Sequence, residues 1–149
     1  MVDVTTEVII NRPLEEVASY AAEPDNAPTW YKNIQSVEWK TDKPLQKGSQ
    51  LTFKAKFMGK EMVYTYEVKQ WESNQRMVMS TVDGPFPMQT TYEWEKVELL
   101  KTRMKLRNNG QPKGFSVLFK PLMVRMMRKA NRKDLEQIKT ILEGNRNGN

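Results

Sequence analysis

The C-terminal third of the chain carries an apolar stripe that constrains the fold more than any other feature. Between residues 115 and 142, apolar side chains recur at steps of three and four, which is the spacing of one face of an α-helix. The stripe consists of Phe115, Leu118, Phe119, Leu122, Met123, Met126, Met127, Ala130, Leu135, Ile138 and Leu142. We therefore predict one long helix that begins between Gly114 and Leu122 and ends near Gly144.

Most of the chain before this helix alternates between apolar and polar residues, as half-buried antiparallel strands do. A first strand is predicted over residues 2–10, two short helices between residues 13 and 32, and further strands from residue 34 to residue 106. One sheet and one long helix can bury their apolar faces only against each other. We therefore expect a single α+β domain over residues 1–149, in which a curved sheet of about seven antiparallel strands wraps round the C-terminal helix.

A hairpin at Gly59-Lys60 is the best-defined turn in the sequence, because glycine in a two-residue loop suits a tight turn. The pairing predicted from this loop places Phe57 opposite Met62 and Phe53 opposite Tyr66. Phe53, Phe57, Tyr64 and Tyr66 would then share the face that contacts the helix, and lysines and Glu67 would occupy the other face.

The composition excludes several kinds of chemistry. The 149 residues include no cysteine and no histidine. Zinc sites built on cysteine or histidine are therefore excluded, and so are Ser-His-Asp and Cys-His catalysis. No pair of carboxylates is clearly directed inward, so we predict neither a metal site nor a cofactor. No apolar run is long enough to span a membrane, and no signal pattern begins the chain, so we expect a cytoplasmic protein.

The order of elements resembles the START-like superfamily, which includes the polyketide cyclase/dehydrase-like proteins and has the helix-grip fold. The resemblance rests on residues 12–17 (Arg-Pro-Leu-Glu-Glu-Val) followed by residues 24–30 (Pro-Asp-Asn-Ala-Pro-Thr-Trp). It is reinforced by Gly48 at a strand start and by residues 65–68, 92–94 and 135–143. The resemblance implies a ligand between the sheet and the C-terminal helix. The superfamily includes lipid carriers, quinone-binding proteins, hormone receptors and cyclases, so the resemblance implies no single activity.

We predict a cavity of a few hundred Å³ between the sheet and the helix, a typical size for small-molecule sites. Methionine adapts to irregular shapes and packs well on aromatic rings, and a buried tyrosine hydroxyl needs a polar partner that a ligand can supply. An ordinary packed core is the alternative interpretation of the same residues. The predicted ligand-binding residues are Phe53, Phe57, Tyr64, Tyr66, Met88, Tyr92, Phe119, Met123, Met126 and Met127.

Basic residues gather near the C-terminus. Between Leu99 and Lys133 there are eleven basic residues and no acidic one, in a chain of net charge +6. Some should pair with glutamates on the neighbouring strand, such as Arg103 with Glu95. The others on the helix, Arg125, Arg128, Lys129 and Arg132, should form one exposed patch. This patch is either a solvated face or a weak contact for an anionic membrane surface; nucleic acid is not expected, because no recognised motif or interleaved aromatic residues accompany it.

Three functions remain open from the sequence. The first is binding of a hydrophobic or aromatic small molecule, such as a lipid, a quinone or a polyketide-like compound. The second is a cyclase or dehydrase-type enzyme that uses Tyr64, Tyr66 or Tyr92, which a pocket-facing Asp, Glu or Arg near these tyrosines would favour. The third is an interaction module that uses the basic helix face.

Overall fold

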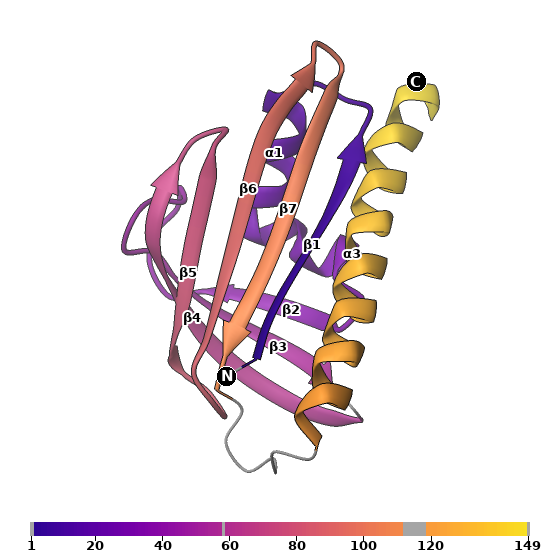
Figure 1. Cartoon of the computed structure of the whole chain (residues 1–149). Helices are drawn as coiled ribbons and strands as arrows, with labels where there is room; N and C mark the ends of the chain where they lie inside the picture. Colours follow the sequence, from indigo (N-terminus) through magenta and orange to yellow (C-terminus); the bar gives the residue numbers. More distant parts are fainter. Residues whose placement is uncertain (1, 58, 112–118, 149) are drawn as a thin grey trace.

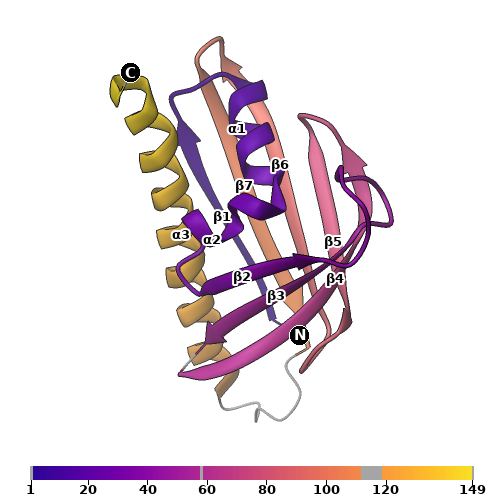
Figure 2. The ribbon, with the colours of Figure 1, turned by 180° about the vertical axis from the view of Figure 1, so that it is seen from behind.

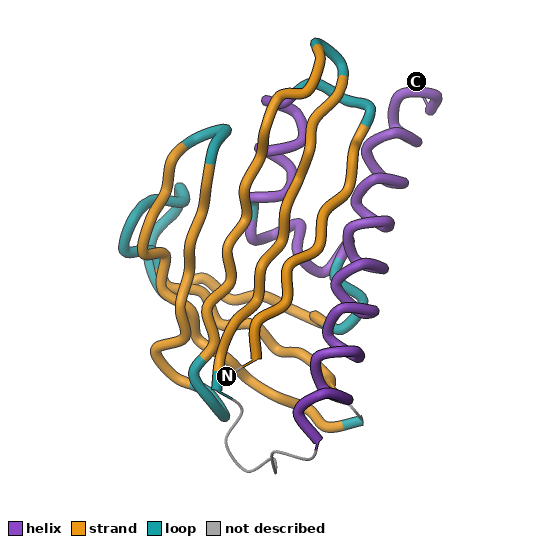
Figure 3. Tube along the Cα trace, viewed as in Figure 1, coloured by secondary structure: helices purple, strands orange, loops and turns teal. Residues whose placement is uncertain are grey.

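A curved antiparallel sheet and one long helix make up most of the molecule (Figures 1 and 3). The computed structural model describes residues 2–57, 59–111 and 119–148, without the side chains of Phe57 and residues 145–148. The strands are β1 (Val2–Ile10), β2 (Ile34–Trp39), β3 (Gln50–Phe57), β4 (Lys60–Glu72), β5 (Arg76–Asp83), β6 (Met88–Glu98) and β7 (Lys101–Gly110). The α+β class and the seven-stranded helix-grip architecture predicted from the sequence are confirmed.

The strands lie in the order β1-β7-β6-β5-β4-β3-β2, and every neighbouring pair is antiparallel. The sheet bends strongly, so β2, β3 and β4 run across one end of the other strands and reach the first half of the long helix (Figures 1 and 2). The curvature leaves a concave side that the helix faces. Register shifts in β2, β4 and the β6–β7 hairpin accompany this bending, as β-bulges generally do.

Two short helices follow β1, as the prolines indicate. Helix α1 (Leu14–Ala22) begins after Pro13, and its first turn contains Glu15 and Glu16, which complement the positive end of the helix dipole. A 3-10 turn, η1 (Pro24–Asn26), leads into α2 (Ala27–Trp30). Figure 2 shows α1 against the inner side of the sheet and α2 beside the long helix. This segment therefore places the residues after Trp30 next to the long helix.

The long helix, α3 (Lys120–Gly148), packs mainly on β1 and α2. Its predicted start is confirmed, whereas the predicted end near Gly144 is wrong, because the helix continues to Gly148. Gly144 is not among the glycines with positive φ, so it does not form the left-handed cap that ends many helices. Phe115 and Leu118 of the predicted stripe lie outside the described residues.

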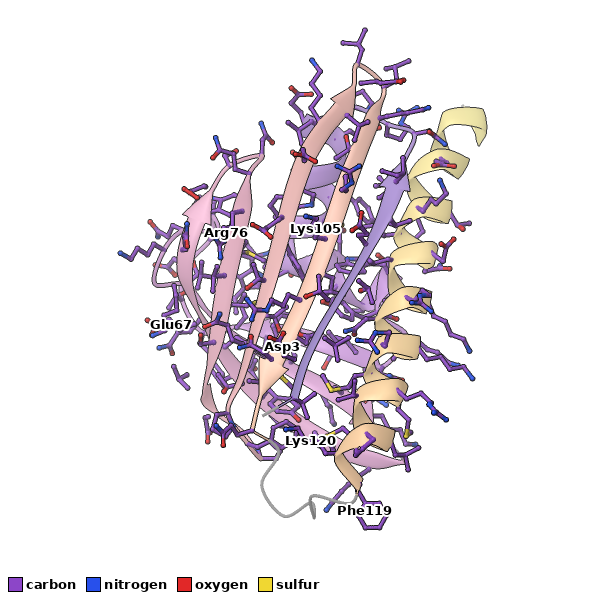
Figure 4. All side chains as sticks on the ribbon, viewed as in Figure 1. Asp3, Glu67, Arg76, Lys105, Phe119 and Lys120 are labelled. Carbon is purple, nitrogen blue, oxygen red and sulfur yellow. The ribbon has the colours of Figure 1, made fainter. Side chains whose placement is uncertain are left out.

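The inward face of α3 differs from the predicted stripe near its N-terminal end. Phe119 is 57% exposed and Leu122 is 47% exposed, so the expectation that both face the core is wrong. Figure 4 shows Phe119 just before α3, projecting away from the sheet. The buried side of the helix is a row of Met123, Met127, Asn131, Asp134, Leu135, Ile138 and Leu142. This row contains two polar residues, which an apolar pattern does not identify.

The β3–β4 hairpin has the predicted faces but a different pairing. Phe57 pairs with Lys60 and Phe53 pairs with Tyr64, so the predicted pairs of Phe57 with Met62 and Phe53 with Tyr66 are wrong by two residues. A shift of two residues keeps every side chain on its predicted face, since the strand period is two. At the β6–β7 hairpin the predicted pair of Glu95 with Arg103 is confirmed, and their side chains form an ion pair at 2.5 Å.

Candidate ligand-binding cavity

A cavity of about 170 Å³ lies between the concave side of the sheet and α3. Strands β3 to β7 form most of its wall, α3 covers it, and the segment after α2 closes one side. This volume is smaller than the few hundred Å³ that the sequence analysis predicts, and it lies below the roughly 300–1,000 Å³ typical of sites for drug-sized ligands. The cavity therefore suits a compact molecule better than a long acyl chain.

Seven of the ten predicted ligand-binding residues line this cavity. They are Phe53, Tyr64, Tyr66, Met88, Tyr92, Met123 and Met127. Two others, Phe119 and Met126, do not line it, and Phe119 is exposed. Phe119 precedes the first residue of α3, and Met126 lies one position before the lining residue Met127, on another face of the helix. The side chain of Phe57 lies outside the described residues.

The cavity wall is mainly aromatic and sulfur-containing. The rings of Phe53 and Tyr66 meet edge to face with centroids 5.8 Å apart, and those of Tyr64 and Phe86 meet in the same way at 5.9 Å. Four methionines complete the apolar wall, namely Met79, Met88, Met123 and Met127. Methionine side chains have several low-energy rotamers, so this wall can adapt to ligands of different shape.

Burial keeps the cavity tyrosines in their protonated form. It raises the pKa of Tyr64 to about 12, and the pKa values of Tyr66 and Tyr92 rise further still. The hydroxyl of Tyr64 donates to Sδ of Met62 at 2.9 Å. These phenols can therefore act as hydrogen-bond donors at neutral pH, but not as bases.

A pair of phenols marks the polar end of the cavity. The hydroxyl oxygens of Tyr31 and Tyr92 are 2.6 Å apart, and either group can be the donor. Tyr31 belongs to the segment after α2, whereas Tyr92 belongs to β6. One proton occupies the hydrogen bond between the two oxygens, so the second phenolic proton is available to another acceptor.

Asp134 of α3 lies beside this pair. Its side chain is 4% exposed, and its Oδ1 accepts a hydrogen bond of 3.1 Å from the backbone N–H of Lys32. Burial raises the pKa of Asp134 from 3.8 to about 6, and this effect outweighs the hydrogen bond and the nearby Lys32 charge, which lower it. Tyr31, Tyr92 and Asp134 all line the cavity, and the negative charge of Asp134 contributes to the raised pKa of both tyrosines.

Asn131 adds an unpartnered amide, one helical turn before Asp134. Its side chain is 6% exposed and lines the cavity, and its Nδ2 has no hydrogen-bond partner among the described residues. Thr90 and Asn108 also line the cavity, but they have each other as partners, since the Thr90 hydroxyl donates to Oδ1 of Asn108 at 2.7 Å. A buried amide without a partner is costly, and water or a ligand commonly satisfies it.

The described residues contain neither a cluster of metal ligands nor a membrane-spanning helix. Within residues 2–57, 59–111 and 119–148, no group of acidic side chains is arranged to hold a metal ion. None of the described helices is long and apolar enough to cross a membrane. A broad hollow follows the outer face of α3, and the described residues that border it all belong to this one helix.

Sequence reasoning missed the polar end of the cavity. Asn131 and Asp134 interrupt the apolar stripe, and Tyr31 follows a four-residue helix in a segment without periodicity. Their spacing contained a usable signal, because residues 123, 127, 131 and 135 recur at steps of four and therefore share one helix face. A face that includes buried Met123 and Leu135 must also contain Asn131.

Comparisons with known proteins agree with this architecture. Solved structures of similar fold include a protein from Thermus thermophilus, with 20% identity, a TM-score of 0.80 and coverage of 92% of this chain and 94% of that one. They also include the Zhui aromatase/cyclase from a Streptomyces species, with 11% identity, a TM-score of 0.79 and coverage of 95% and 93%.

A START superfamily protein from Mycobacterium smegmatis has 16% identity, a TM-score of 0.73 and coverage of 96% and 95%. At these identities the likeness concerns the fold alone. A search of curated protein sequences gives no match. The family model described as "Polyketide cyclase / dehydrase and lipid transport" matches residues 1–143. The chain therefore belongs to the polyketide cyclase/dehydrase and lipid transport family.

Proposed function

We propose that the protein binds a compact hydrophobic or aromatic small molecule in the cavity between the sheet and α3. The observation that supports this best is the wall itself, in which aromatic rings and four methionines surround about 170 Å³. A lipid fragment, a quinone or a polyketide-like compound would fit this description, and the small volume favours one or two rings. The ligand-binding roles of the seven lining residues named above are part of this proposal.

Titration with 2-naphthol tests the binding function. We expect saturable quenching of tryptophan fluorescence, because Trp30 packs on Tyr31 and Tyr92 with ring centroids 4.1 and 5.8 Å apart. An Ala130→Phe variant places a ring in the cavity from α3 and should weaken binding at least tenfold. Binding of equal strength in this variant would contradict the proposed location.

A second candidate function is enzymatic proton transfer, and Asp134 is the observation that favours it. A pocket-facing acid near the tyrosines is the feature that would favour an enzyme. Asp134 is such an acid, with a pKa of about 6 that lets it act as a base at neutral pH. Its carboxylate would remove a proton from the carbon next to a ligand carbonyl. The C–H electron pair would then form an enolate, whose oxygen accepts a hydrogen bond from a phenol.

Deuterium exchange distinguishes an enzyme from a carrier. The probe is 2-tetralone in D₂O, with NMR detection of exchange at C1. An enzyme accelerates this exchange above the buffer rate, and an Asp134→Asn variant loses the acceleration. Exchange at the buffer rate with bound 2-tetralone would exclude this candidate and leave the carrier function.

We further propose a weak contact between an anionic membrane surface and the outer face of α3. Arg125, Arg128, Lys129 and Arg132 are all exposed. None of the four forms an ion pair with a described residue, in contrast to Arg103 on β7. Each such residue can add about 1 kcal/mol of attraction to an anionic surface. The cytoplasmic location inferred from the sequence remains a prediction.

Co-sedimentation with vesicles of anionic phospholipid tests this contact. We expect weak binding at low salt that disappears at high salt, since screening shortens the range of these charges. A variant with Arg125, Arg128 and Arg132 replaced by glutamine should lose the binding and keep its stability. Equal sedimentation of the variant would show that these residues do not form the contact.

A further inference from the structure

Four polar residues of the cavity lie together at one end. Asn131 and Asp134 face inward from consecutive turns of α3, and Tyr31 and Tyr92 face them from the α2–β2 segment and from β6. The rest of the described wall is apolar except for the hydroxyls of Tyr64 and Tyr66, for Asn33 and Lys56, and for the Thr90–Asn108 pair, whose side chains bond to each other. A ligand that fills the cavity therefore has an apolar body and one end next to these four residues.

This end retains both donor and acceptor capacity. The Tyr31–Tyr92 pair has one phenolic proton left after its mutual hydrogen bond. Nδ2 of Asn131 has no partner in the described part of the chain. Asp134 uses Oδ1 for the Lys32 N–H, and no described group donates to its other oxygen. A ligand that satisfies all of these groups must both donate and accept hydrogen bonds.

We propose that the ligand is a neutral, hydroxyl-bearing apolar molecule, a phenol or an alcohol, whose hydroxyl donates to Asp134 and accepts from Asn131 or the Tyr31–Tyr92 pair. This inference rests on the proposed binding function and names the chemical class of its ligand. It also assigns the selection of that class to Asn131 and Asp134, which are polar residues within the buried row of α3.

Other head groups fit this end less well. A carboxylate would lie beside the Asp134 carboxylate, which is ionised at pH 7.5 because its pKa is about 6. An ether accepts hydrogen bonds but cannot donate to Asp134, and an ammonium donates but cannot accept from Asn131 or the phenols. A hydrocarbon would leave all of these groups unsatisfied in a site that it has closed to water. The charged and titratable groups that face Asp134 are Tyr31, Tyr92 and Lys32, and burial raises the pKa of both tyrosines, so neither phenol ionises near pH 7.5.

Binding of a matched series of naphthalenes tests this inference. The series is 2-naphthol, 2-methoxynaphthalene, naphthalene, 2-naphthoate and 2-naphthylmethylamine, titrated at pH 7.5 and followed by tryptophan fluorescence. We expect 2-naphthol to bind at least tenfold more tightly than every other member. In an Asp134→Asn variant, the preference over 2-methoxynaphthalene should fall below threefold, and 2-naphthoate should bind more tightly than it does to the wild type.

Two further variants separate recognition of the ligand hydroxyl from packing of its rings against the apolar wall. Asn131→Ala should weaken 2-naphthol more than naphthalene, whereas Met123→Leu, in the apolar wall, should change all members by the same factor. Equal affinities across the series, or tightest binding of the acid, the ether or the amine, would overturn the inference while the binding function stands. If no member of the series binds, the proposed function fails and the inference fails with it.

Discussion

Replacing Asp134 by asparagine should make the protein more stable at neutral pH. Asp134 is buried without an ion-pair partner among the described residues, and its pKa is about 6 rather than the usual 3.8. The folded state therefore binds a proton more tightly at this site than the unfolded chain does. Below about pH 4, Asp134 does not lower the free energy of unfolding. The free energy of unfolding then falls as the pH rises through the folded pKa, and the full loss is reached above about pH 6.

The size of the effect follows from the two pKa values. Each factor of ten in proton affinity corresponds to about 1.4 kcal/mol, so a rise from 3.8 to about 6 corresponds to about 3 kcal/mol of lost stability at pH 7.5. Asparagine keeps an oxygen that can accept the Lys32 N–H, but it is itself a buried polar group. We therefore expect a net gain of about 1–3 kcal/mol for Asp134→Asn at pH 7.5, and little difference at pH 4.

Urea unfolding of both proteins at several pH values between 4 and 8 measures this difference. Comparing the two proteins removes the contribution of other carboxylates, such as Asp3, whose pKa is lowered by Arg107. An Asp3→Asn control should instead lower the free energy of unfolding at pH 7.5. The loss should be less than about 1 kcal/mol, because the Asp3–Arg107 ion pair is exposed. A variant at Asp134 that is less stable than the wild type at pH 7.5, or a difference independent of pH, would refute the reasoning.

Two further substitutions test the packing. Gly110→Ala should lower the free energy of unfolding by about 1–3 kcal/mol. The reason is that the added Cβ would lie 2.4 Å from the carbonyl oxygen of Pro87 and 3.0 Å from Sδ of Met88. Urea unfolding measures the change, and an unchanged midpoint would show that the end of β7 can move without a loss of stability. Ile138→Ala should lower the free energy of unfolding by about 2–5 kcal/mol, because Ile138 is fully buried. Leu122→Ala should change it by no more than about 0.5 kcal/mol, because Leu122 is 47% exposed. Equal losses would contradict the orientation of α3.

The sequence predicts the fold well because period-two and period-3.6 patterns are both long in this chain. Strand β6 is an example, since the buried Tyr92 and Trp94 alternate with the exposed Glu93 and Glu95. The β3–β4 hairpin shows the limit of such patterns. Alternation fixes which face a residue such as Tyr64 occupies, but it cannot distinguish two registers that differ by two residues.

The cavity could be predicted in part. The aromatic and methionine wall follows from the faces of the strands and of α3. Its polar end does not, because Asn131 and Asp134 are residue types that usually face solvent, and only the packing of α3 on β1 and α2 turns them inward. Phe119 is exposed and precedes the first residue of α3, so the pattern of the helix does not determine its orientation.

Methionine-methyl NMR can show whether the cavity binds a small apolar molecule. Met79, Met88, Met123 and Met127 line the cavity, whereas Met77 and Met104 are buried elsewhere in the core, at 2% and 0% exposure. Titration of protein labelled with ¹³C at the methionine methyls should move the first four signals along one saturable curve when 2-naphthol is added, and leave the other two in place. Absence of saturation, or equal shifts at Met77 and Met104, would contradict binding in this cavity.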